Sequence, residues 1–358
     1  MRNPLDRIKP QVRALRAYSL SPQRTRVKLN QNENPWDAPT RIKEATLRRL
    51  ETRKWSRYPS FVPESLNACL AEFSNWRPDG IIAGNGSNEL IQALLMVTIG
   101  PGKRVLISEP TFALYRQIAT VLGGEVISVS LTPELSYDRN ALQNRVADFQ
   151  PDVTIVCSPN NPTGCRLNDQ DLCALLESTS GIVVVDEAYH EFAEHSVVPL
   201  LPDHKNFVVL RTFSKAMAMA ALRVGYLLTA PELAAEISKA VLPYNLNAIS
   251  QTAAEVAVEL YEEELRPLVR QIISERERLY AELALIEGLM PVRSLANFMV
   301  VQSSIDPKQV FAELIKRDIL IRDVSGYPML SNYFRLSVGT PEENDLLLSA
   351  LHEIFEAR

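Results

Sequence analysis

Apolar residues recur in short, uninterrupted runs between residues 86 and 230, and amphipathic stretches separate these runs. The runs have the length and the branched side chains of strands, and they lie at residues 104–108, 125–129, 153–157, 182–186, 207–211 and 224–228. Helical spacing is found between them, at residues 89–97, 114–121, 140–149 and 169–177. Such alternation predicts right-handed crossover units, and runs without polar interruption are typical of parallel strands buried on both faces. The pattern therefore predicts an α/β fold with a mainly parallel sheet covered by helices.

The pattern changes after Pro243. Residues 249–286 have nearly continuous helical spacing, with Pro267 as the expected break. A strand at 298–302, a helix at 307–317, two short strands and a closing helix from Pro341 are expected to form a smaller α+β domain. The length of 358 residues also favours two domains. We expect an N-terminal arm that packs with the small domain or a partner subunit, a large domain and a small C-terminal domain, at residues 1–39, 40–245 and 246–358.

Composition narrows the class of protein. A net charge of -5 argues against a nucleic-acid partner, so an anionic ligand must be held by a few local donors. The four cysteines have no metal-binding spacing, and reduced thiols in a cytoplasmic protein are expected. Residues 1–10 contain no apolar signal segment, and no apolar run is long enough to cross a membrane.

One turn with two glycines precedes a predicted helix, and a second turn, with two prolines and a glycine, follows a predicted strand. Residues 84–89 open a helix, and their glycines permit a tight turn. The backbone amides of Ser87 and Asn88 would point from this helix N-terminus, which favours a phosphate, although both residues are also ordinary N-caps. Residues 158–164 would present the side chain of Asn161 as a hydrogen-bond donor, unless they form a simple strand-to-helix turn.

Asp186 follows four apolar residues at the end of a predicted strand. A buried carboxylate needs a cationic or hydrogen-bonding partner, and a protonated pyridine nitrogen would provide one. A metal ligand and a structural cap are the competing interpretations. No histidine or carboxylate cluster supports the metal.

Lys215 lies at the mouth of another predicted strand. An unpaired ammonium is costly to bury, whereas an imine with an aldehyde cofactor removes the charge and gives a covalent attachment. Thr212, Ser214 and Arg223 flank the lysine and suit a phosphate dianion. A Ser214–Lys215 dyad for acyl transfer is the alternative, but it leaves Asp186 and Arg223 without a role.

Taken in this order, these residues resemble the pyridoxal-phosphate aminotransferases of fold type I, and in particular the histidinol-phosphate aminotransferase family. The resemblance covers nearly the whole chain through residues 28–35, 58–59, 84–89, 110–112, 158–164, 186–189, 212–215, 222–223 and 335–340. It implies a seven-stranded sheet in the large domain, pyridoxal 5'-phosphate as cofactor and a homodimer with shared active sites. It also implies ping-pong transfer of an amino group, through an internal aldimine on Lys215, to a 2-oxo acid that we expect to be 2-oxoglutarate.

The resemblance assigns a role to individual residues. The catalytic residues are Lys215, which also moves the proton, Asp186, which pairs with the pyridine nitrogen, and Tyr189, which hydrogen-bonds the 3'-oxygen together with Asn161. The remaining cofactor contacts are the stacking ring of Phe112 and the phosphate ligands Ser87, Asn88, Thr212, Ser214, Arg223 and, from the neighbouring subunit, Tyr58. The substrate contacts are Arg335 for the α-carboxylate, Arg322 for the substrate phosphate, and Tyr18 and Asn34 in the N-terminal arm.

Three positions depart from the family pattern. The arm lacks the usual Tyr-x-Pro-Gly motif after Tyr18, Asn88 replaces a common aspartate, and Ala221 replaces a glycine. We expect transamination of histidinol phosphate in histidine biosynthesis. An aromatic amino-acid aminotransferase and a threonine-phosphate decarboxylase have nearly the same motifs and are the alternatives. A non-catalytic ligand sensor is a further possibility, but no basic helix-turn-helix segment precedes residue 30.

Overall fold

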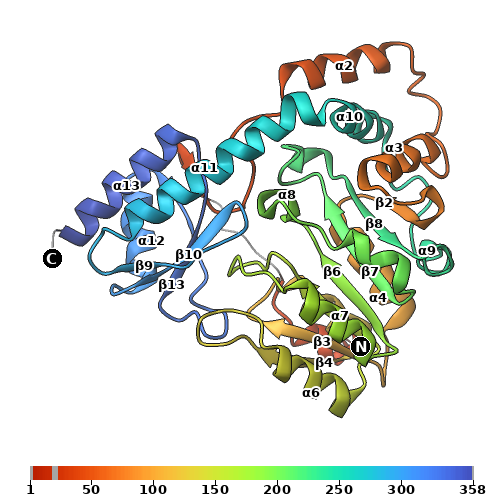
Figure 1. Ribbon diagram of the computed structural model, residues 1–358, viewed down its shortest axis with the longest axis horizontal. Helices are drawn as coiled ribbons and strands as arrows, with labels where there is room; N and C mark the ends of the chain where they lie inside the picture. The colour runs from red at the N-terminus through yellow and green to blue at the C-terminus, as the bar shows by residue number, and fades with distance from the viewer. Residues whose placement is uncertain (1–2, 18–22, 357–358) are drawn as a thin grey trace.

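The computed structural model describes residues 3–17 and 23–356, and its largest element is a seven-stranded sheet (Figure 1). The strands are β2 (Ile81–Gly84), β3 (Arg104–Glu109), β4 (Glu125–Ser130), β5 (Val153–Cys157), β6 (Ile182–Asp186), β7 (Phe207–Thr212) and β8 (Gly225–Thr229). Their order is β2-β8-β7-β6-β5-β3-β4, and only β8 runs antiparallel to its neighbours. The prediction of a mainly parallel sheet is confirmed. The short strand β2 was not predicted.

Helices cover both faces of this sheet. One face packs against α4 (Ser87–Thr98), α5 (Leu114–Leu122) and α9 (Pro231–Ser238). The other packs against α2 (Thr40–Glu51), α3 (Glu64–Ser74), α6 (Arg139–Phe149) and α7 (Asp169–Ser178). Within β6, Val184 faces the first set of helices, while Val183 and Val185 face the second. Side chains alternate along a strand, so an unbroken apolar run is needed when both faces are covered.

A second, four-stranded antiparallel sheet lies in the C-terminal part of the chain, to the left in Figure 1. Its order is β12-β13-β10-β9, with bounds Arg322–Asp323, Tyr333–Ser337, Phe298–Ser303 and Leu289–Pro291. The helices α11 (Arg266–Leu283), α12 (Pro307–Lys316) and α13 (Pro341–Glu356) pack with it around a separate apolar core. The expected smaller α+β unit is therefore present.

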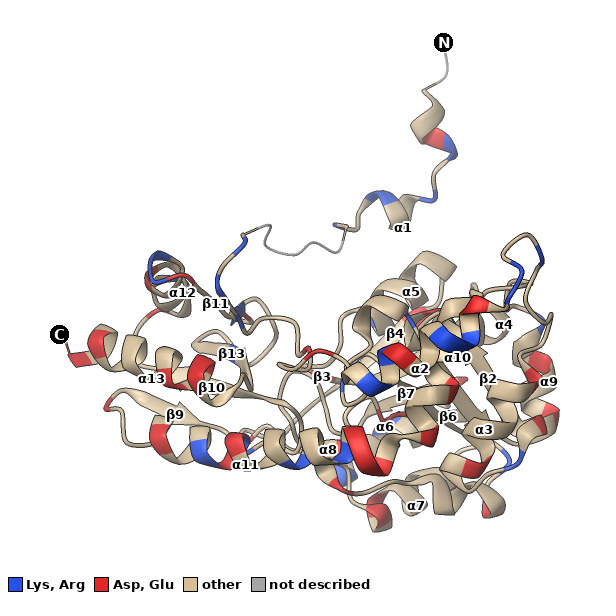
Figure 2. Ribbon diagram, turned by 90° about the horizontal axis from the view of Figure 1, so that it is seen from above, with Lys and Arg blue, Asp and Glu red and all other residues tan. Residues whose placement is uncertain are grey.

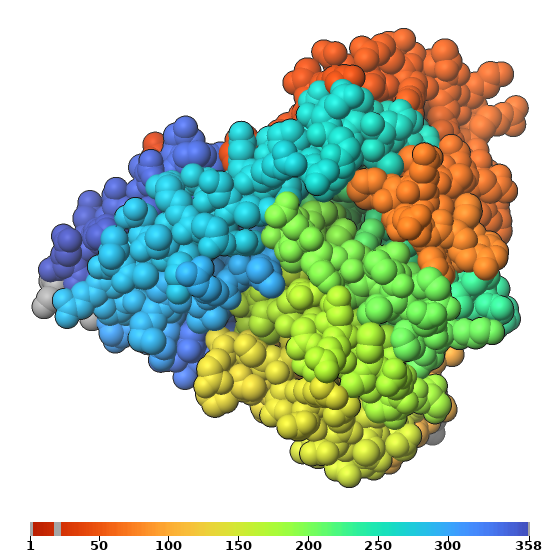
Figure 3. Space-filling view, viewed as in Figure 1, coloured from red at the N-terminus to blue at the C-terminus, as the bar shows by residue number. Residues whose placement is uncertain are grey.

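The long helix predicted at 249–286 is divided into two. The first part, α10 (Ala248–Glu259), ends in a π-helical turn at Tyr261–Leu265, and α11 follows. Pro267 lies in the first turn of α11, where its missing N–H breaks no helical bond, so the interruption precedes the proline. Helix α10 packs on α2 and α3, and Figure 3 shows α10 (cyan) beside α2 (red-orange). The predicted domain boundaries stay a prediction.

The N-terminal arm contacts both parts of the molecule. Its first elements are η1 (Pro4–Arg7) and α1 (Pro10–Arg13), and α1 lies against α5 (Figure 2). Lys9 Nζ donates a hydrogen bond to the carbonyl of Val121 at 3.1 Å. Further along, β1 (Val27–Lys28) pairs in parallel with β11 (Ile319–Leu320). The chain then crosses toward the large sheet.

Short elements complete the fold. They are α8 (His190–Ala193), η2 (Pro78–Gly80), η3 (Val198–Asp203) and η4 (Ala220–Leu222). All four cysteines are free thiols. Among the described residues, no helix combines the length and the apolar character needed to span a bilayer.

Candidate active site

A cavity of about 480 Å³ lies at the carboxyl ends of β5, β6 and β7. Open α/β sheets bind their ligands at this edge. The predicted residues that line it are Ser87, Asn88, Phe112, Asn161, Asp186, Tyr189, Thr212, Ser214, Lys215, Arg223, Arg322 and Arg335. It is also lined by residues that the sequence did not single out, among them Asn32 and Tyr115. The structure thus brings together side chains that are more than 240 positions apart in sequence, from Ser87 to Arg335.

The glycine turn before α4 forms one end of the cavity. Gly86 has a φ of +81°, a region that favours glycine, and a Cβ at this position would lie 2.3 Å from Nη2 of Arg223. Nη1 of Arg223 and Oγ1 of Thr212 both donate hydrogen bonds to Ser214 Oγ, each at 3.0 Å. Helix α4 begins at Ser87, so its free amides and the positive end of its dipole face the same place. A guanidinium, hydroxyls and a helix N-terminus together suit a phosphate dianion.

Asp186 is the last residue of β6 and is 3 % exposed. Its Oδ2 accepts a hydrogen bond from the Tyr115 hydroxyl at 2.6 Å, and its Oδ1 accepts one from the amide of Ala188 at 3.0 Å. Burial raises the pKa of the Asp186 carboxyl, and the hydrogen bond from Tyr115 opposes this rise. Within residues 3–17 and 23–356, no basic side chain forms an ion pair with Asp186. The cavity therefore offers a buried carboxylate to a cationic group of a ligand.

Lys215 follows β7 and points its amine into the cavity. Nζ donates a hydrogen bond to the carbonyl of Gln31 at 2.9 Å and lies 5.9 Å from the centre of the Tyr189 ring. Burial, followed by the positive charge of Arg335, lowers the pKa of the Lys215 amine to about 8. More of the amine is therefore uncharged near neutral pH than in an ordinary lysine, as a nucleophile and proton acceptor requires.

Two arginines form a second cationic region of the cavity. Arg322 on β12 is the register partner of Arg335 on β13, and directly opposite residues of antiparallel strands present their side chains on one face. Arg335 Nη1 donates to Asn161 Oδ1 at 2.5 Å, and Nη2 donates to the carbonyl of Asn30 at 2.8 Å. Because the oxygen of Asn161 is engaged by Arg335, its amide nitrogen is the part that can serve a ligand oxygen.

Two of the predicted site residues that the structure describes, Asn34 and Tyr58, do not line the cavity. Asn34 donates to the carbonyl of Ala216 at 3.2 Å and so supports the segment that carries Lys215. Tyr58 is 80 % exposed and stacks on Tyr244 with ring centres 4.5 Å apart. Tyr18 lies outside the described residues. The ligand contacts expected of these residues stay predictions.

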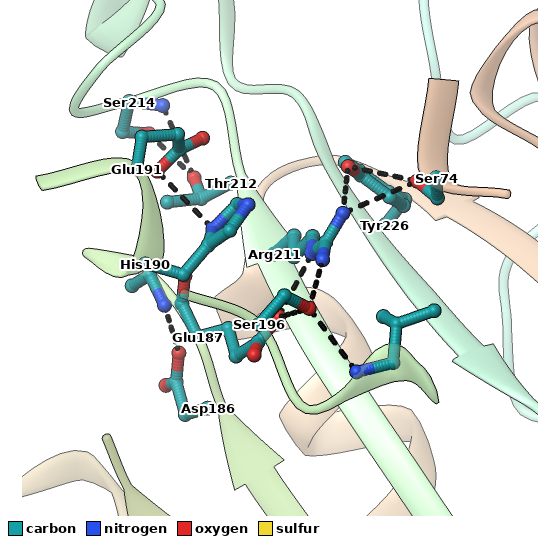
Figure 4. Close-up of polar contacts among 12 residues, drawn as sticks. Ser74, Asp186, Glu187, His190, Glu191, Ser196, Arg211, Thr212, Ser214 and Tyr226 are labelled. Atoms are coloured by element: carbon teal, nitrogen blue, oxygen red, sulfur yellow. Dashed lines mark hydrogen bonds and ion pairs between the residues drawn. The ribbon is translucent and has the colours of Figure 1, made fainter. Parts of the chain in front are cut away.

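A buried ion pair between Glu187 and Arg211 lies at the ends of β6 and β7, behind the cavity (Figure 4). Glu187 Oε2 accepts from Arg211 Nε at 3.0 Å, and Oε1 accepts from the amide of Val197 at 2.6 Å. Ser196 Oγ donates to Glu187 at 3.1 Å and accepts from Arg211 Nη2 at 2.6 Å. Arg211 Nη1 also donates to the hydroxyls of Ser74 and Tyr226. This network ties the ends of β6 and β7 together.

Comparison with known proteins identifies the class. The family model described as "Aminotransferase class I and II" matches residues 24–351. That span includes both sheets and all the cavity residues named above. The fold and the site therefore define an aminotransferase of class I and II.

Curated relatives match almost the whole chain. A histidinol-phosphate aminotransferase of Chlorobium phaeobacteroides is 39 % identical over 347 residues, which are 96 % of this chain and 96 % of the relative. One from Chlorobium limicola is 37 % identical and covers 98 % of each chain. The chain belongs to the histidinol-phosphate aminotransferase family.

Solved structures confirm the fold. The histidinol-phosphate aminotransferase of Sinorhizobium meliloti, in complex with pyridoxal-5'-phosphate, superposes with a TM-score of 0.87 at 24 % identity over 98 % of both chains. The L-threonine-O-3-phosphate decarboxylase of Porphyromonas gingivalis superposes with a TM-score of 0.80 at 22 % identity, over 92 % of this chain and 99 % of that one. Enzymes named for different reactions therefore share this fold, so the fold does not choose between them.

The residues present fit pyridoxal phosphate, which is the cofactor of this chain. The turn at Gly86 leaves room that a Cβ would fill, beside the guanidinium of Arg223. The buried Asp186 forms no ion pair with a basic side chain of the described residues, as expected where a protonated ring nitrogen is to be bound. The amine of Lys215 lies in the same cavity with a lowered pKa.

Proposed function

We propose that the protein transfers the amino group of histidinol phosphate to 2-oxoglutarate, with the predicted residues in the roles given above. The observation that carries this proposal is the register of Arg322 with Arg335, which aims two guanidinium groups at one cavity. Like charges placed directly opposite are unfavourable in a sheet, and an anionic ligand would offset that cost. Histidinol phosphate offers a phosphate and no α-carboxylate, whereas glutamate offers carboxylates, so two arginines allow one pocket to bind both.

The residues around the cavity divide the work. When bound, pyridoxal phosphate supplies the withdrawal of electrons from the reacting carbon of the amino donor. Asp186 keeps the ring nitrogen protonated, because a buried carboxylate favours a cation beside it. Lys215, whose pKa is lowered to about 8, takes the proton from the reacting carbon at Nζ and returns it at the neighbouring position. Arg223, Ser214 and the N-terminus of α4 hold the cofactor phosphate and so fix the position of the ring.

Substrate choice is tested by removing Arg322. In Arg322→Ala we expect the concentration of histidinol phosphate needed for half-maximal bleaching of the cofactor absorbance to rise about ten- to hundredfold, because one charged hydrogen bond to phosphate is lost. The value for glutamate is expected to change less than about threefold, because Arg335 still binds its carboxylate. Arg293→Ala is the matched control, since that arginine is 73 % exposed and lies outside the cavity.

Other results with these variants and substrates would contradict parts of the proposal. Equal losses for histidinol phosphate and glutamate would remove Arg322 from the phosphate-binding role. Bleaching by phenylalanine or tyrosine and not by histidinol phosphate would favour an aromatic amino-acid aminotransferase. Release of carbon dioxide from threonine phosphate would favour a decarboxylase. Unimpaired turnover in Lys215→Ala would contradict the mechanism for all of these substrates.

A homodimer with shared active sites is part of the proposal. It is supported by an exposed aromatic group between α2 and α3, where Trp55 is 83 % and Tyr58 80 % exposed and Phe61 packs edge-on to Tyr244. Apolar clusters of this kind mark interaction surfaces. We propose that Tyr58 reaches the cofactor phosphate of the partner subunit. A cytoplasmic location remains the expectation from the cysteine pattern.

Mixed dimers test the sharing of residues. A subunit with Lys215→Ala keeps its own Tyr58, and a subunit with Tyr58→Ala keeps its own Lys215. If Tyr58 acts across the interface, mixing the two inactive variants creates dimers with one complete site, and activity returns toward about a quarter of the wild-type value by random pairing. A mixture that stays as inactive as its components would contradict the shared site.

A further inference from the structure

We propose that Asn32 is a positioning residue, which directs the hydroxyl proton of Tyr189 into the cavity so that Tyr189 acts as a hydrogen-bond donor to the ring oxygen of the cofactor. The inference rests on the proposed role of Tyr189, and it assigns a task to a residue outside the set predicted from sequence. It concerns the cofactor end of the site and is independent of which amino donor is used.

The direction of the hydrogen bond follows from the chemistry of the two groups. Asn32 Nδ2 donates to the Tyr189 hydroxyl oxygen at 3.1 Å. A phenol has one proton to donate and accepts through its oxygen. Because the amide N–H occupies the accepting side of that oxygen, the phenol proton must point to another acceptor. The cavity that both residues line is where such an acceptor would be bound.

The orientation of the Asn32 amide is set by Ser337. The amide nitrogen of the Asn32 backbone donates to Ser337 Oγ at 2.9 Å, so the proton of this hydroxyl is available for a different partner. Ser337 Oγ in turn donates to Asn32 Oδ1 at 3.1 Å. With Oδ1 committed to Ser337, the NH₂ group of the side chain is the part that faces Tyr189.

The backbone around Asn32 is fastened at several points. Asn32 is 1 % exposed, and its carbonyl accepts a hydrogen bond from Asn297 Nδ2 at 3.0 Å. The two preceding carbonyls bind Lys215 and Arg335, at 2.9 and 2.8 Å. The Asn32 side chain therefore has little freedom relative to the amine and the carboxylate-binding arginine, as a positioning group requires.

Tyr189 itself is held as a neutral phenol. Its ring packs edge-on against Phe298 with centres 5.0 Å apart, and burial raises its pKa, so the hydroxyl keeps its proton at neutral pH. The charged and titratable groups that act on it come from other elements, namely Arg335 on β13, Cys157 on β5, Asp186 on β6 and Lys215 after β7. Asn32 donates a hydrogen bond to the hydroxyl oxygen itself, so we assign the orientation of the hydroxyl to Asn32.

The test uses Asn32→Gly and the pH midpoint of the visible absorbance of the bound cofactor. Asn32 has a φ of 55°, which glycine adopts without strain, so this variant removes the side chain and keeps the backbone. A donor to the ring oxygen stabilises the more negative form at high pH, so its loss raises the midpoint. We expect a rise of about one pH unit in Tyr189→Phe, from the worth of a charged hydrogen bond, and about half of that in Asn32→Gly.

A double variant separates positioning from mere structural support. If Asn32 acts through the Tyr189 hydroxyl, Asn32→Gly adds nothing to the midpoint of Tyr189→Phe. A shift that persists in the Tyr189→Phe background, or an unchanged midpoint in Asn32→Gly alone, would overturn the inference. The dissociation constant of pyridoxal phosphate from each variant gives a second readout, with a rise expected for each single variant and no further rise for the double.

Ser337→Ala provides a variant that keeps Asn32 in place. It removes the group that fixes the amide orientation, so we expect a smaller rise of the midpoint in the same direction, again absent in the Tyr189→Phe background. These measurements need no amino donor. Wild-type protein that shows no visible band with pyridoxal phosphate would refute the proposed function, whereas a normal band that is insensitive to Asn32 refutes this inference alone.

Discussion

Asp186 and Glu187 are neighbours in sequence, and both are buried, yet their surroundings differ (Figure 4). Glu187 is 1 % exposed and accepts hydrogen bonds from Arg211, Ser196 and the amide of Val197. Asp186 is 3 % exposed and accepts them from Tyr115 and the amide of Ala188. Only Glu187 is paired with a cation of the described chain.

The different surroundings of the two carboxylates follow from the alternation of side chains at the end of a strand. Successive side chains at the end of a strand point to opposite faces, so Asp186 faces the cavity and Glu187 the rear. On β7 the same alternation sends Thr212 into the cavity and Arg211 to Glu187. The rear pair is neutralised within the protein and holds the strands in register. The front carboxylate forms no such ion pair within the described residues, which agrees with its proposed role in binding the cofactor.

The largest effect is expected where the rear pair is broken. Glu187→Gln leaves Arg211 as a buried charge without its counter-ion, so we expect the free energy of unfolding to fall by about 3–5 kcal/mol. Urea unfolding of the cofactor-free protein measures this loss. The double variant Glu187→Gln with Arg211→Met removes both charges and should recover most of it. A loss below about 1 kcal/mol in the single variant would show that water or a neighbour compensates Arg211.

The front carboxylate should behave in the opposite way. In Asp186→Asn we expect turnover to fall by roughly 10²–10³-fold, the usual cost of removing one charge-stabilising group. Because burial raises the pKa of Asp186, its contribution to stability is greatest below the unfolded value of 3.8 and is lost as pH rises through the folded pKa.

The carboxylate therefore costs stability at neutral pH, and Asp186→Asn should leave the unfolding free energy of the cofactor-free protein equal or higher. Urea unfolding beside Glu187→Gln makes the comparison direct. A destabilisation as large as that of Glu187→Gln would mean that Asp186 has a structural counter-ion after all.

The two carboxylates also show what sequence can and cannot predict. The apolar run 182–185 predicts a buried strand, and the charge that follows predicts a functional group. The sequence does not reveal that Arg211 lies behind Glu187, because that pairing depends on the register of β6 with β7. Tyr115 was missed for a related reason, since a tyrosine on an apolar helix face resembles a core residue until a carboxylate is seen beside it.

Other differences are local. The strand β2 has four residues and ends in glycine, too short for a pattern to mark it. The break in the helical stretch near 260 comes from a π-helical turn, which leaves no proline or glycine signature at Tyr261–Leu265. Asn32 lies within the segment 28–35 that carries the family resemblance, yet its contact with Tyr189 joins residues 157 positions apart. Contacts between residues so far apart in sequence cannot be predicted from local sequence patterns.

Lys215 is the basic group on the cavity side, and its lowered pKa should also affect stability. Its folded pKa of about 8 lies below the unfolded value of 10.5, so the unfolded chain binds more protons between these values. Stability of the cofactor-free protein should therefore rise with pH across this window, by about 2–3 kcal/mol from this group. The difference between wild-type protein and Lys215→Met, measured by urea unfolding from pH 7.5 to 10, isolates the effect. Parallel curves for the two proteins would show that the Lys215 amine is charged in the folded state.

The smallest effect is expected from the hydroxyl that supports Asp186. Tyr115→Phe removes the donor at 2.6 Å from Oδ2 and so raises the pKa of the carboxyl further, which weakens its hold on the ring nitrogen. We expect the dissociation constant of pyridoxal phosphate to rise about tenfold, near the lower end for a hydrogen bond to a charged group.

Tyr137→Phe is the matched control, because its hydroxyl donates to the carbonyl of Cys157 at 2.5 Å and does not line the cavity. That variant should lose stability and retain cofactor affinity. If both variants weakened cofactor binding equally, general loosening of the β5 and β6 ends would explain the result. A weakening of cofactor binding in Tyr115→Phe alone would mean that the Tyr115 hydroxyl, a neutral donor, holds the Asp186 carboxylate in place. The carboxylate would then be positioned for the cationic ring nitrogen, although it forms no ion pair within the described chain.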